Sequence, residues 1–112
     1  MNDPQFVEAS RILAEKMIQV TSSVTSSLAM SQRLTYGFEA LTSRKPRAAE
    51  LSELMSLFEK QQKHFIENRD KAEKLLSIGE YPRDKSLDVA ELAAYTVVVS
   101  MIMNFDEFVV ER

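Results

Sequence analysis

The sequence predicts an all-α fold, a compact bundle of about five helices with no sheet, and three observations support this prediction. Only two glycines and three prolines occur in 112 residues, which is too few for the many tight turns of a sandwich or barrel. Apolar residues recur at helical spacing along most of the chain. Hydrophobic residues make up 45% of the chain and charged residues 28%, as in folded globular proteins. The length fits a single helical domain, residues 1–112.

The first helix is expected over residues 4–20. Asp3 is suited to cap its free amide groups, and Pro4 fits the first helical position because no hydrogen bond is lost there. The helix is amphipathic. Its apolar face comprises Phe6, Ala9, Leu13, Met17 and Val20, and its polar face comprises Glu8, Arg11, Glu15 and Gln19.

Two further helices are expected over residues 24–41 and about 47–67, where apolar residues again recur at helical spacing. The Ser/Thr-rich stretch 21–27 is typical of a helix junction, since short hydroxyl side chains compete for backbone groups. Gly37 lies inside the second helix, where we expect it to permit close packing against another helix. Pro46 stops that helix, because the residue before a proline is pushed out of the α region.

Asn68 is expected to cap a short fourth helix that carries apolar residues up to Ile78. Gly79 supplies the left-handed residue that ends it, and residues 80–87 then form the one long loop.

The last helix is expected over residues 88–103. Asp88 and Glu91 have the spacing of a capping box, with Asp88 as the cap. The helix is almost continuously apolar, which predicts that it is buried on all sides at the centre of the bundle.

Composition excludes several classes of function. Fourteen Lys and Arg against seventeen Asp and Glu give a net charge of −3, so we expect no nucleic-acid partner. Because the chain has no cysteine, a disulfide framework, a thiolate metal site, a covalent haem site and a cysteine nucleophile are excluded within it. We expect no cofactor in this chain. The longest apolar stretch, residues 92–103, is shorter than the roughly 18–20 residues of a membrane helix, so no transmembrane segment is expected.

Catalytic groupings are scarce. His64 is the single histidine, and the cations Lys60 and Lys63 beside it disfavour a metal ion, so we interpret it as an ordinary surface residue. Asp106 and Glu107 form a close carboxylate pair near an apolar segment. Neighbouring side chains on a helix diverge by about 100°, however, so these two do not converge on one substrate atom. The sequence shows no catalytic constellation and favours a role other than catalysis.

The loop from Gly79 to Asp84 is the stretch richest in chemical groups. Arg83 offers a planar fork of five donors. It could clamp the loop internally through Glu80, Asp84 and backbone carbonyl groups, or it could grip a carboxylate or phosphate of a ligand. We favour the internal clamp, because a loop between two packed helices must find partners for its own polar groups.

Short stretches also occur in a distinctive order along nearly the whole chain: Asn2-Asp3-Pro4, Phe6-Val7-Glu8-Ala9, Arg44 and Pro46 before a Glu-rich helix, Leu75-Leu76 with Gly79-Glu80, Pro82-Arg83-Asp84, Leu87-Asp88, Glu91-Leu92-Ala93-Ala94, and Asn104 with Asp106-Glu107-Phe108. In order and spacing they resemble the C-terminal end of a planctomycete domain of unknown function. That family closes large exported proteins, which often carry an N-terminal cytochrome c-like domain. The family tends to have Gly in place of Ser43, Pro in place of Lys45 and Leu in place of Phe105.

The resemblance implies that this chain is an excised C-terminal module of an exported or envelope-associated protein whose role is uncharacterised. Any haem would lie elsewhere in the parent protein, in agreement with the lack of a CxxCH motif here. No catalytic role is known for any of the matching polar positions, which are Asn2, Asp3, Glu80, Arg83, Asp84, Asn104, Asp106 and Glu107.

Two functions follow as expectations. The first is a structural and interaction module that packs on the rest of its parent, on a partner chain or on a second copy through an apolar face. The second is a contribution to a ligand or catalytic site of the full-length parent, for example for a carbohydrate, lined by Glu80, Arg83 and Asp84.

Overall fold

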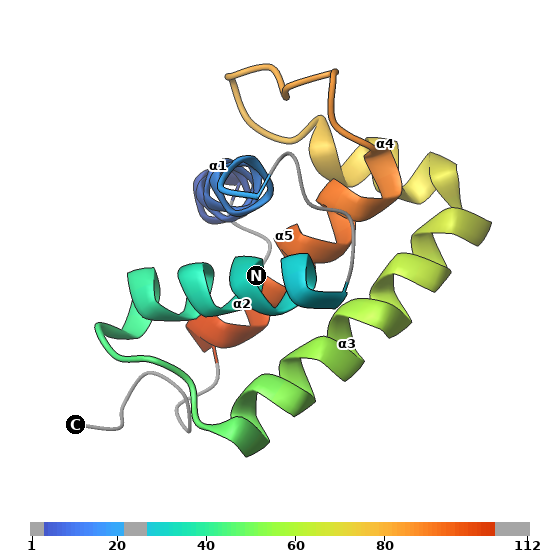
Figure 1. Ribbon diagram of the computed structural model, residues 1–112. Coiled ribbons are helices and arrows are strands. Elements are labelled where there is room, and N and C mark those ends of the chain that lie inside the picture. The colour runs from blue at the N-terminus through green and yellow to red at the C-terminus, as the bar shows by residue number, and fades with distance from the viewer. Residues whose placement is uncertain (1–3, 22–26, 105–112) are drawn as a thin grey trace.

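The computed structural model describes residues 4–21 and 27–104, and this part of the chain forms five α-helices and no strand. The all-α prediction is therefore confirmed (Figure 1). The helices are α1 Pro4–Gln19, α2 Ser27–Thr42, α3 Ala48–Glu67, α4 Arg69–Leu76 and α5 Val89–Asn104.

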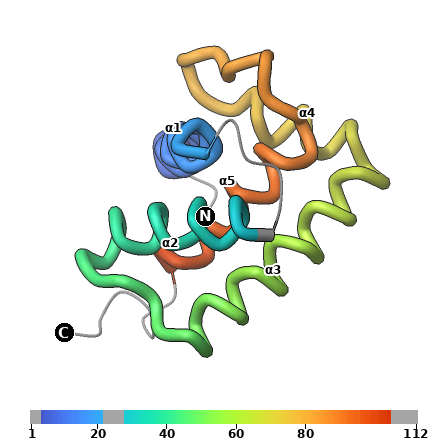
Figure 2. Tube along the Cα trace, in the orientation of Figure 1, coloured from blue at the N-terminus to red at the C-terminus, as the bar shows by residue number. Residues whose placement is uncertain are grey.

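The last helix, α5, lies at the centre of the bundle, as its composition predicts. It contacts each of the other four helices, which surround it in the trace of Figure 2. Its buried side chains point in all directions, among them Leu92, Tyr95 and Val98. An apolar helix is stable in water only where neighbours cover every side, so α5 organises the packing of the rest.

Two polar or aromatic contacts fix α5 against its neighbours inside this core. The hydroxyl of Ser100 donates a hydrogen bond to the hydroxyl of Ser10 on α1 (3.1 Å), which in turn donates to the carbonyl of Phe6 (3.0 Å). The rings of Tyr95 on α5 and Phe58 on α3 stack with centroids 4.0 Å apart. The buried hydroxyl groups thus have partners, and the aromatic pair adds directional packing.

Gly37 permits the close approach of α2 to α1, as the sequence analysis expects. A Cβ atom at this position would lie 2.5 Å from the sulfur of Met17, which is fully buried. A larger side chain would force the buried side chain of Met17 to move.

The corner between α2 and α3 combines a left-handed residue with an ion pair. Ser43, just after α2, has φ 65°. Arg44 binds both carboxylate oxygens of Glu50 (2.9 Å each), and Glu50 also accepts the backbone N–H of Arg47 (2.9 Å). These interactions lower the pKa of Glu50 from 4.5 to about 2, with the hydrogen bond from Arg44 as the largest cause.

The ends of α4 differ from the sequence prediction. The Asn68 side chain does not cap α4; its amide donates to the carbonyl of His64 (2.9 Å) and so closes α3, whose last carbonyl groups lack helical partners. The helix stops at Leu76, two residues before Ile78, and a turn leads to Gly79.

Of the two helix caps predicted from the sequence, the one at the start of α5 is confirmed. Asp88 accepts the N–H of Glu91 (2.9 Å) and caps α5 as predicted. Asp3, the expected cap of α1, lies outside the described residues.

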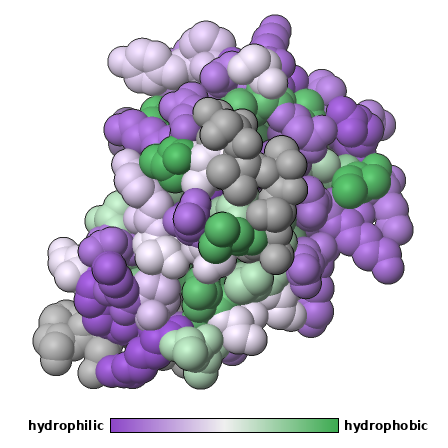
Figure 3. Space-filling view, in the orientation of Figure 1, coloured by the Kyte–Doolittle hydropathy of each residue, from purple (hydrophilic) through white to green (hydrophobic). Residues whose placement is uncertain are grey.

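The face of the molecule in Figure 3 is largely hydrophilic, with hydrophobic side chains in small separate patches. The large exposed apolar and aromatic residues of the described part are Val20, Leu28, Tyr36, Ile66 and Tyr81. None of the helices in this part is long and apolar enough to cross a membrane.

Candidate functional site

The loop between α4 and α5 carries Glu80, Arg83 and Asp84, and it is attached to the polar face of α1. In Figure 1 the loop passes beside α1, which is seen end-on. Hydrogen bonds join Tyr81 and Asp84 of the loop to side chains of α1. The candidate site is therefore built from the loop and α1 together.

Arg11 is the centre of this attachment, and its side chain is only 1% exposed. Its Nη2 donates to the carbonyl oxygen of Tyr81 (2.6 Å), and its Nη1 binds Glu15 (2.8 Å). The carboxylate of Glu8 lies 3.7 Å from Nη2. A buried guanidinium is costly unless carboxylates compensate its charge, and here two carboxylates do so.

The same two carboxylates hold the loop backbone. Glu8 accepts the N–H of Tyr81 (2.6 Å), and Glu15 accepts the N–H of Asp84 (3.0 Å). Glu8, Arg11 and Glu15 follow one another at spacings of three and four residues, so they lie on one face of α1. Three side chains of one helix thus satisfy three polar groups of the loop backbone.

Gly79 lets the loop enter this arrangement. Its φ of 108° is a conformation that favours glycine. A Cβ atom there would lie 2.5 Å from the carboxyl carbon of Glu8. The loop therefore approaches α1 more closely than any larger residue would allow.

Asp84 stabilises the second half of the loop. One of its carboxylate oxygens accepts hydrogen bonds from the hydroxyl (2.6 Å) and the N–H (3.0 Å) of Ser86, and the other lies 3.4 Å from the amide of Gln19. The side-chain hydrogen bond from Ser86 is the main reason that the pKa of Asp84 is lowered. The carboxylate of Asp84 thus acts within the loop itself.

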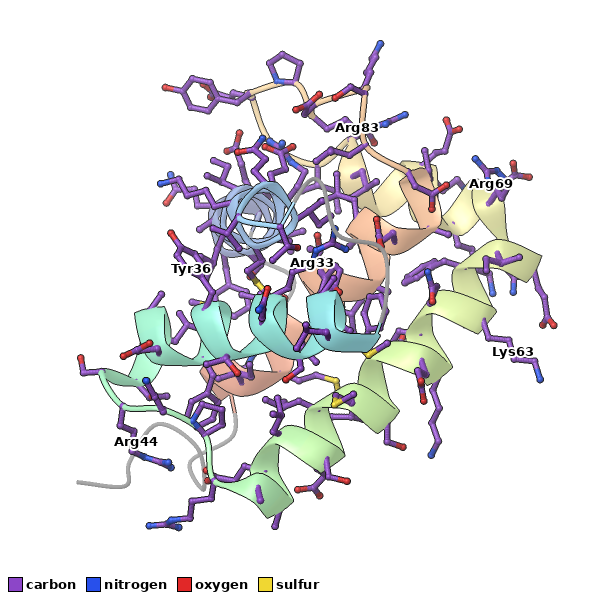
Figure 4. The ribbon with its side chains drawn as sticks, viewed as in Figure 1. Arg33, Tyr36, Arg44, Lys63, Arg69 and Arg83 are labelled. Atoms are coloured by element: carbon purple, nitrogen blue, oxygen red, sulfur yellow. The ribbon has the colours of Figure 1, made fainter. Side chains whose placement is uncertain are left out.

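The other polar residues predicted from the sequence take different positions. Glu80 is exposed, and Arg83 is half-buried on the loop (Figure 4), with no hydrogen bond or ion pair to any described residue. Asn104 is far from the loop in sequence and donates to the carbonyl of Ser100 (2.8 Å) at the end of α5. The remaining polar positions singled out in the sequence, Asn2, Asp3, Asp106 and Glu107, lie outside the described residues.

The role of Arg11 was not predicted from the sequence. Helical periodicity places this residue on an outward polar face of α1, whereas the structure buries it beneath the loop. A clue is present in the sequence, because carboxylates three residues before and four residues after an arginine can neutralise it on one helix face. Periodicity alone does not show whether such a face meets solvent or another segment.

A second buried arginine, Arg33 on α2, was also not singled out. It points into the bundle in Figure 4, where its Nε donates to the hydroxyl of Thr21 (2.6 Å) and its Nη1 pairs with Glu91 of α5 (2.9 Å). Its guanidinium lies 5.8 Å from the ring centre of Tyr95. Burial is the main cause that raises the pKa of Tyr95, and the hydrogen bond from Arg33 opposes it. Arg33 thus joins α2 both to Thr21, two residues after α1, and to α5.

An open hollow of about 480 Å³ lies where the loop meets the start of α1. Its lining consists of Pro4, Gln5, Glu8, Gly79, Glu80 and Tyr81. The side chain of Tyr81 is 70% exposed although its backbone N–H and carbonyl are both fixed to α1. The hollow thus combines an accessible aromatic ring with carboxylates on a firmly held backbone.

Within residues 4–21 and 27–104, no group of three or more His, Asp or Glu side chains is arranged to hold a metal ion. His64, interpreted as a surface residue, is exposed on α3 and packs edge-on against Phe65.

Comparisons of the chain with protein-family models, with curated proteins and with solved structures found no match.

Proposed function

We propose that this chain is a structural and interaction module, and that its contact element is the loop from Gly79 to Asp84. One observation carries this proposal: Tyr81 exposes 70% of its surface while both of its backbone polar groups are bound by α1. The aromatic ring is thus presented to a partner from a fixed backbone.

Such an arrangement is favourable for binding because little freedom is left to lose. Tyrosine is enriched among the residues that dominate interface energies, and a preorganised loop avoids much of the entropic cost of association. The N–H and carbonyl of Tyr81 and the N–H of Asp84 are already bound by Glu8, Arg11 and Glu15. The contact would therefore rely on the ring of Tyr81, on Pro82 and on the exposed Glu80.

The resemblance to the planctomycete family supports the rest of an exported parent protein as the first partner to test, followed by a separate chain. A photoreactive phenylalanine analogue at position 81 provides the test in the native cells. We expect one defined crosslinked protein from position 81 and none from a matched probe at Lys74, which is exposed on α4. Equal crosslinking from both positions, or none from position 81, would overturn the proposal.

A second candidate function is a ligand site, and the hollow beside the loop favours it. An exposed aromatic ring next to the carboxylate of Glu80 can stack on a sugar ring and accept its hydroxyl hydrogen bonds. Titration of the isotope-labelled chain with oligosaccharides should then shift the backbone resonances of Glu80 and Tyr81. Shifts that disappear in Tyr81→Ala would favour this function over the first, and unchanged resonances would exclude it for the sugars tested.

A further inference from the structure

The loop between α4 and α5 is held on the bundle in a different way from the helices. Residues 80–86 of this loop are called the strap below. In Figure 2 the strap runs along the outside of the bundle, past α1. None of its side chains is buried, since Arg83 and Asp84 are half-buried and the others are exposed. Burial of apolar surface, the main force that holds the helices together, therefore contributes little to holding the strap.

The strap is attached to α1 through polar groups. Tyr81 is bound at its N–H by Glu8 and at its carbonyl by Arg11, and the N–H of Asp84 is bound by Glu15. The two carboxylates also compensate the charge of the buried arginine. These three side chains of α1, called the α1 triad below, thus hold the strap and one another. Because the members of such a network strengthen one another, we expect the attachment to be lost as a whole rather than bond by bond.

The closed strap has a cost as well as a gain in free energy. Arg11 carries a permanent charge, and its side chain is only 1% exposed. Its Nε is buried and has no hydrogen-bond partner among the described residues. When the strap leaves α1, water reaches this guanidinium, so the hydration gained offsets part of the hydrogen bonding lost. The strap is therefore held less strongly than the core of the bundle.

The helices can keep their packing when the strap leaves α1. Leu76 and Val89, near the two ends of the strap, are buried, and α4 packs directly against α5. The first helix also packs against α5, with a hydrogen bond from Ser100 to Ser10 between them (3.1 Å). Gly79 precedes the strap and can serve as a hinge, because glycine adopts many backbone conformations at low cost.

We propose that the strap opens from α1 as one unit while the five helices stay folded, and that the α1 triad keeps it closed. Segments with few buried apolar contacts open locally at a lower free energy than the whole domain unfolds. Opening removes Tyr81 from its fixed position and uncovers Arg11. Its consequence for binding rests on the proposed function: the strap then switches the contact element between a presented and a withdrawn state.

Native-state hydrogen exchange of the isotope-labelled chain, at urea concentrations below the unfolding transition, tests the proposal. We expect the amides of Tyr81 and Asp84 to share one free energy of opening that does not change with urea, because opening exposes little surface. Their protection should be about 100-fold lower than that of Val98 and Val99 in α5. Exchange at these two core amides should require global unfolding and so accelerate with urea.

The variant Glu15→Gln shows whether the α1 triad acts as one group. The change removes a charge beside Arg11, while the amide oxygen can still accept the N–H of Asp84. We expect exchange about tenfold faster at Tyr81 as well as at Asp84, although Glu15 is bonded to the second of these amides and not to the first. The reciprocal change Glu8→Gln should likewise accelerate exchange at Asp84.

The matched control is Gln19→Ala, because Gln19 lies 3.4 Å from the carboxylate of Asp84 but outside the α1 triad. Exchange at Tyr81 should change by less than about twofold in this variant. Circular dichroism of each variant checks that the bundle remains helical.

Two results would overturn the proposal. One is exchange at Tyr81 and Asp84 that accelerates with urea as steeply as in α5, since the strap then opens only when the whole chain unfolds. The other is a Glu15→Gln variant that accelerates exchange at Asp84 alone, since the contacts are then independent. No partner takes part in these measurements, so they can fail while the crosslinking test of the proposed function succeeds, and the reverse.

Discussion

Replacement of Arg11 by Met is the most direct test of the structure. The change preserves the apolar stem of this buried side chain but removes the hydrogen bond to Tyr81 and the charge between Glu8 and Glu15. Removal of one partner from a buried ion pair typically costs about 3–5 kcal/mol. Glu8 and Glu15 are 13% and 15% exposed and recover part of their hydration, so we expect a loss of about 3 kcal/mol.

A loss of this size is a large part of the roughly 5–15 kcal/mol by which a domain is stable, and it lowers Tm by roughly 12 °C. Urea unfolding at neutral pH followed by circular dichroism measures it, and hydrogen exchange should show faster exchange at the amides of Tyr81 and Asp84. Arg83→Met is the matched control, since Arg83 binds no other described residue, and it should change stability by less than about 0.5 kcal/mol. Equal losses in the two variants, or an Arg11→Met variant as stable as the natural chain, would refute the role of Arg11 in holding the loop.

Three further changes probe the backbone and the α2–α3 corner. Ser43→Gly should raise stability by about 1 kcal/mol, because φ 65° is strained for serine, and a lower urea midpoint would contradict this. Gly79→Ala should lower stability by about 2 kcal/mol or more through its φ of 108° and the clash with Glu8, and thermal unfolding measures the loss. The pKa of Glu50 is about 2 in the folded chain and 4.5 by default, so its stabilisation is present above about pH 4.5 and disappears as pH falls toward 2. After solvent screening, the lowered pKa of Glu50 contributes about 2 kcal/mol to the free energy of unfolding at neutral pH. In Glu50→Gln this contribution is absent, so the free energy of unfolding should fall less steeply between pH 4.5 and 2.

The fold was predictable because its determinants are local or compositional. Helical spacing of apolar residues located all five helices, and the continuous apolarity of α5 predicted its central place. Gly37 within a helical pattern predicted a close helix contact, and the structure places it against Met17 of α1.

The candidate site was only partly predictable. The dense loop was recognised, and Asp84 does stabilise it, but the basic residue that binds the loop is Arg11, seventy positions before Tyr81. No periodic pattern reveals a contact across that distance, because a polar helix face looks the same whether water or a loop covers it. The Asn68 side chain shows the same limit over a shorter range, since its orientation lets Nδ2 donate to His64 at the end of α3, while its oxygen caps no N–H of α4.

Arg11 and Arg33 solve one physical problem in two places. Each is buried on a helix, pairs with a glutamate, and donates a second hydrogen bond to an oxygen of a segment outside that helix, the carbonyl of Tyr81 or the hydroxyl of Thr21. A guanidinium can do this because its donors diverge in a fixed plane, whereas the ammonium of lysine is a compact point charge that hydrates more strongly. In a bundle with few turns, these two arginines hold the connecting segments to the core, while the side chain of Tyr81 stays exposed.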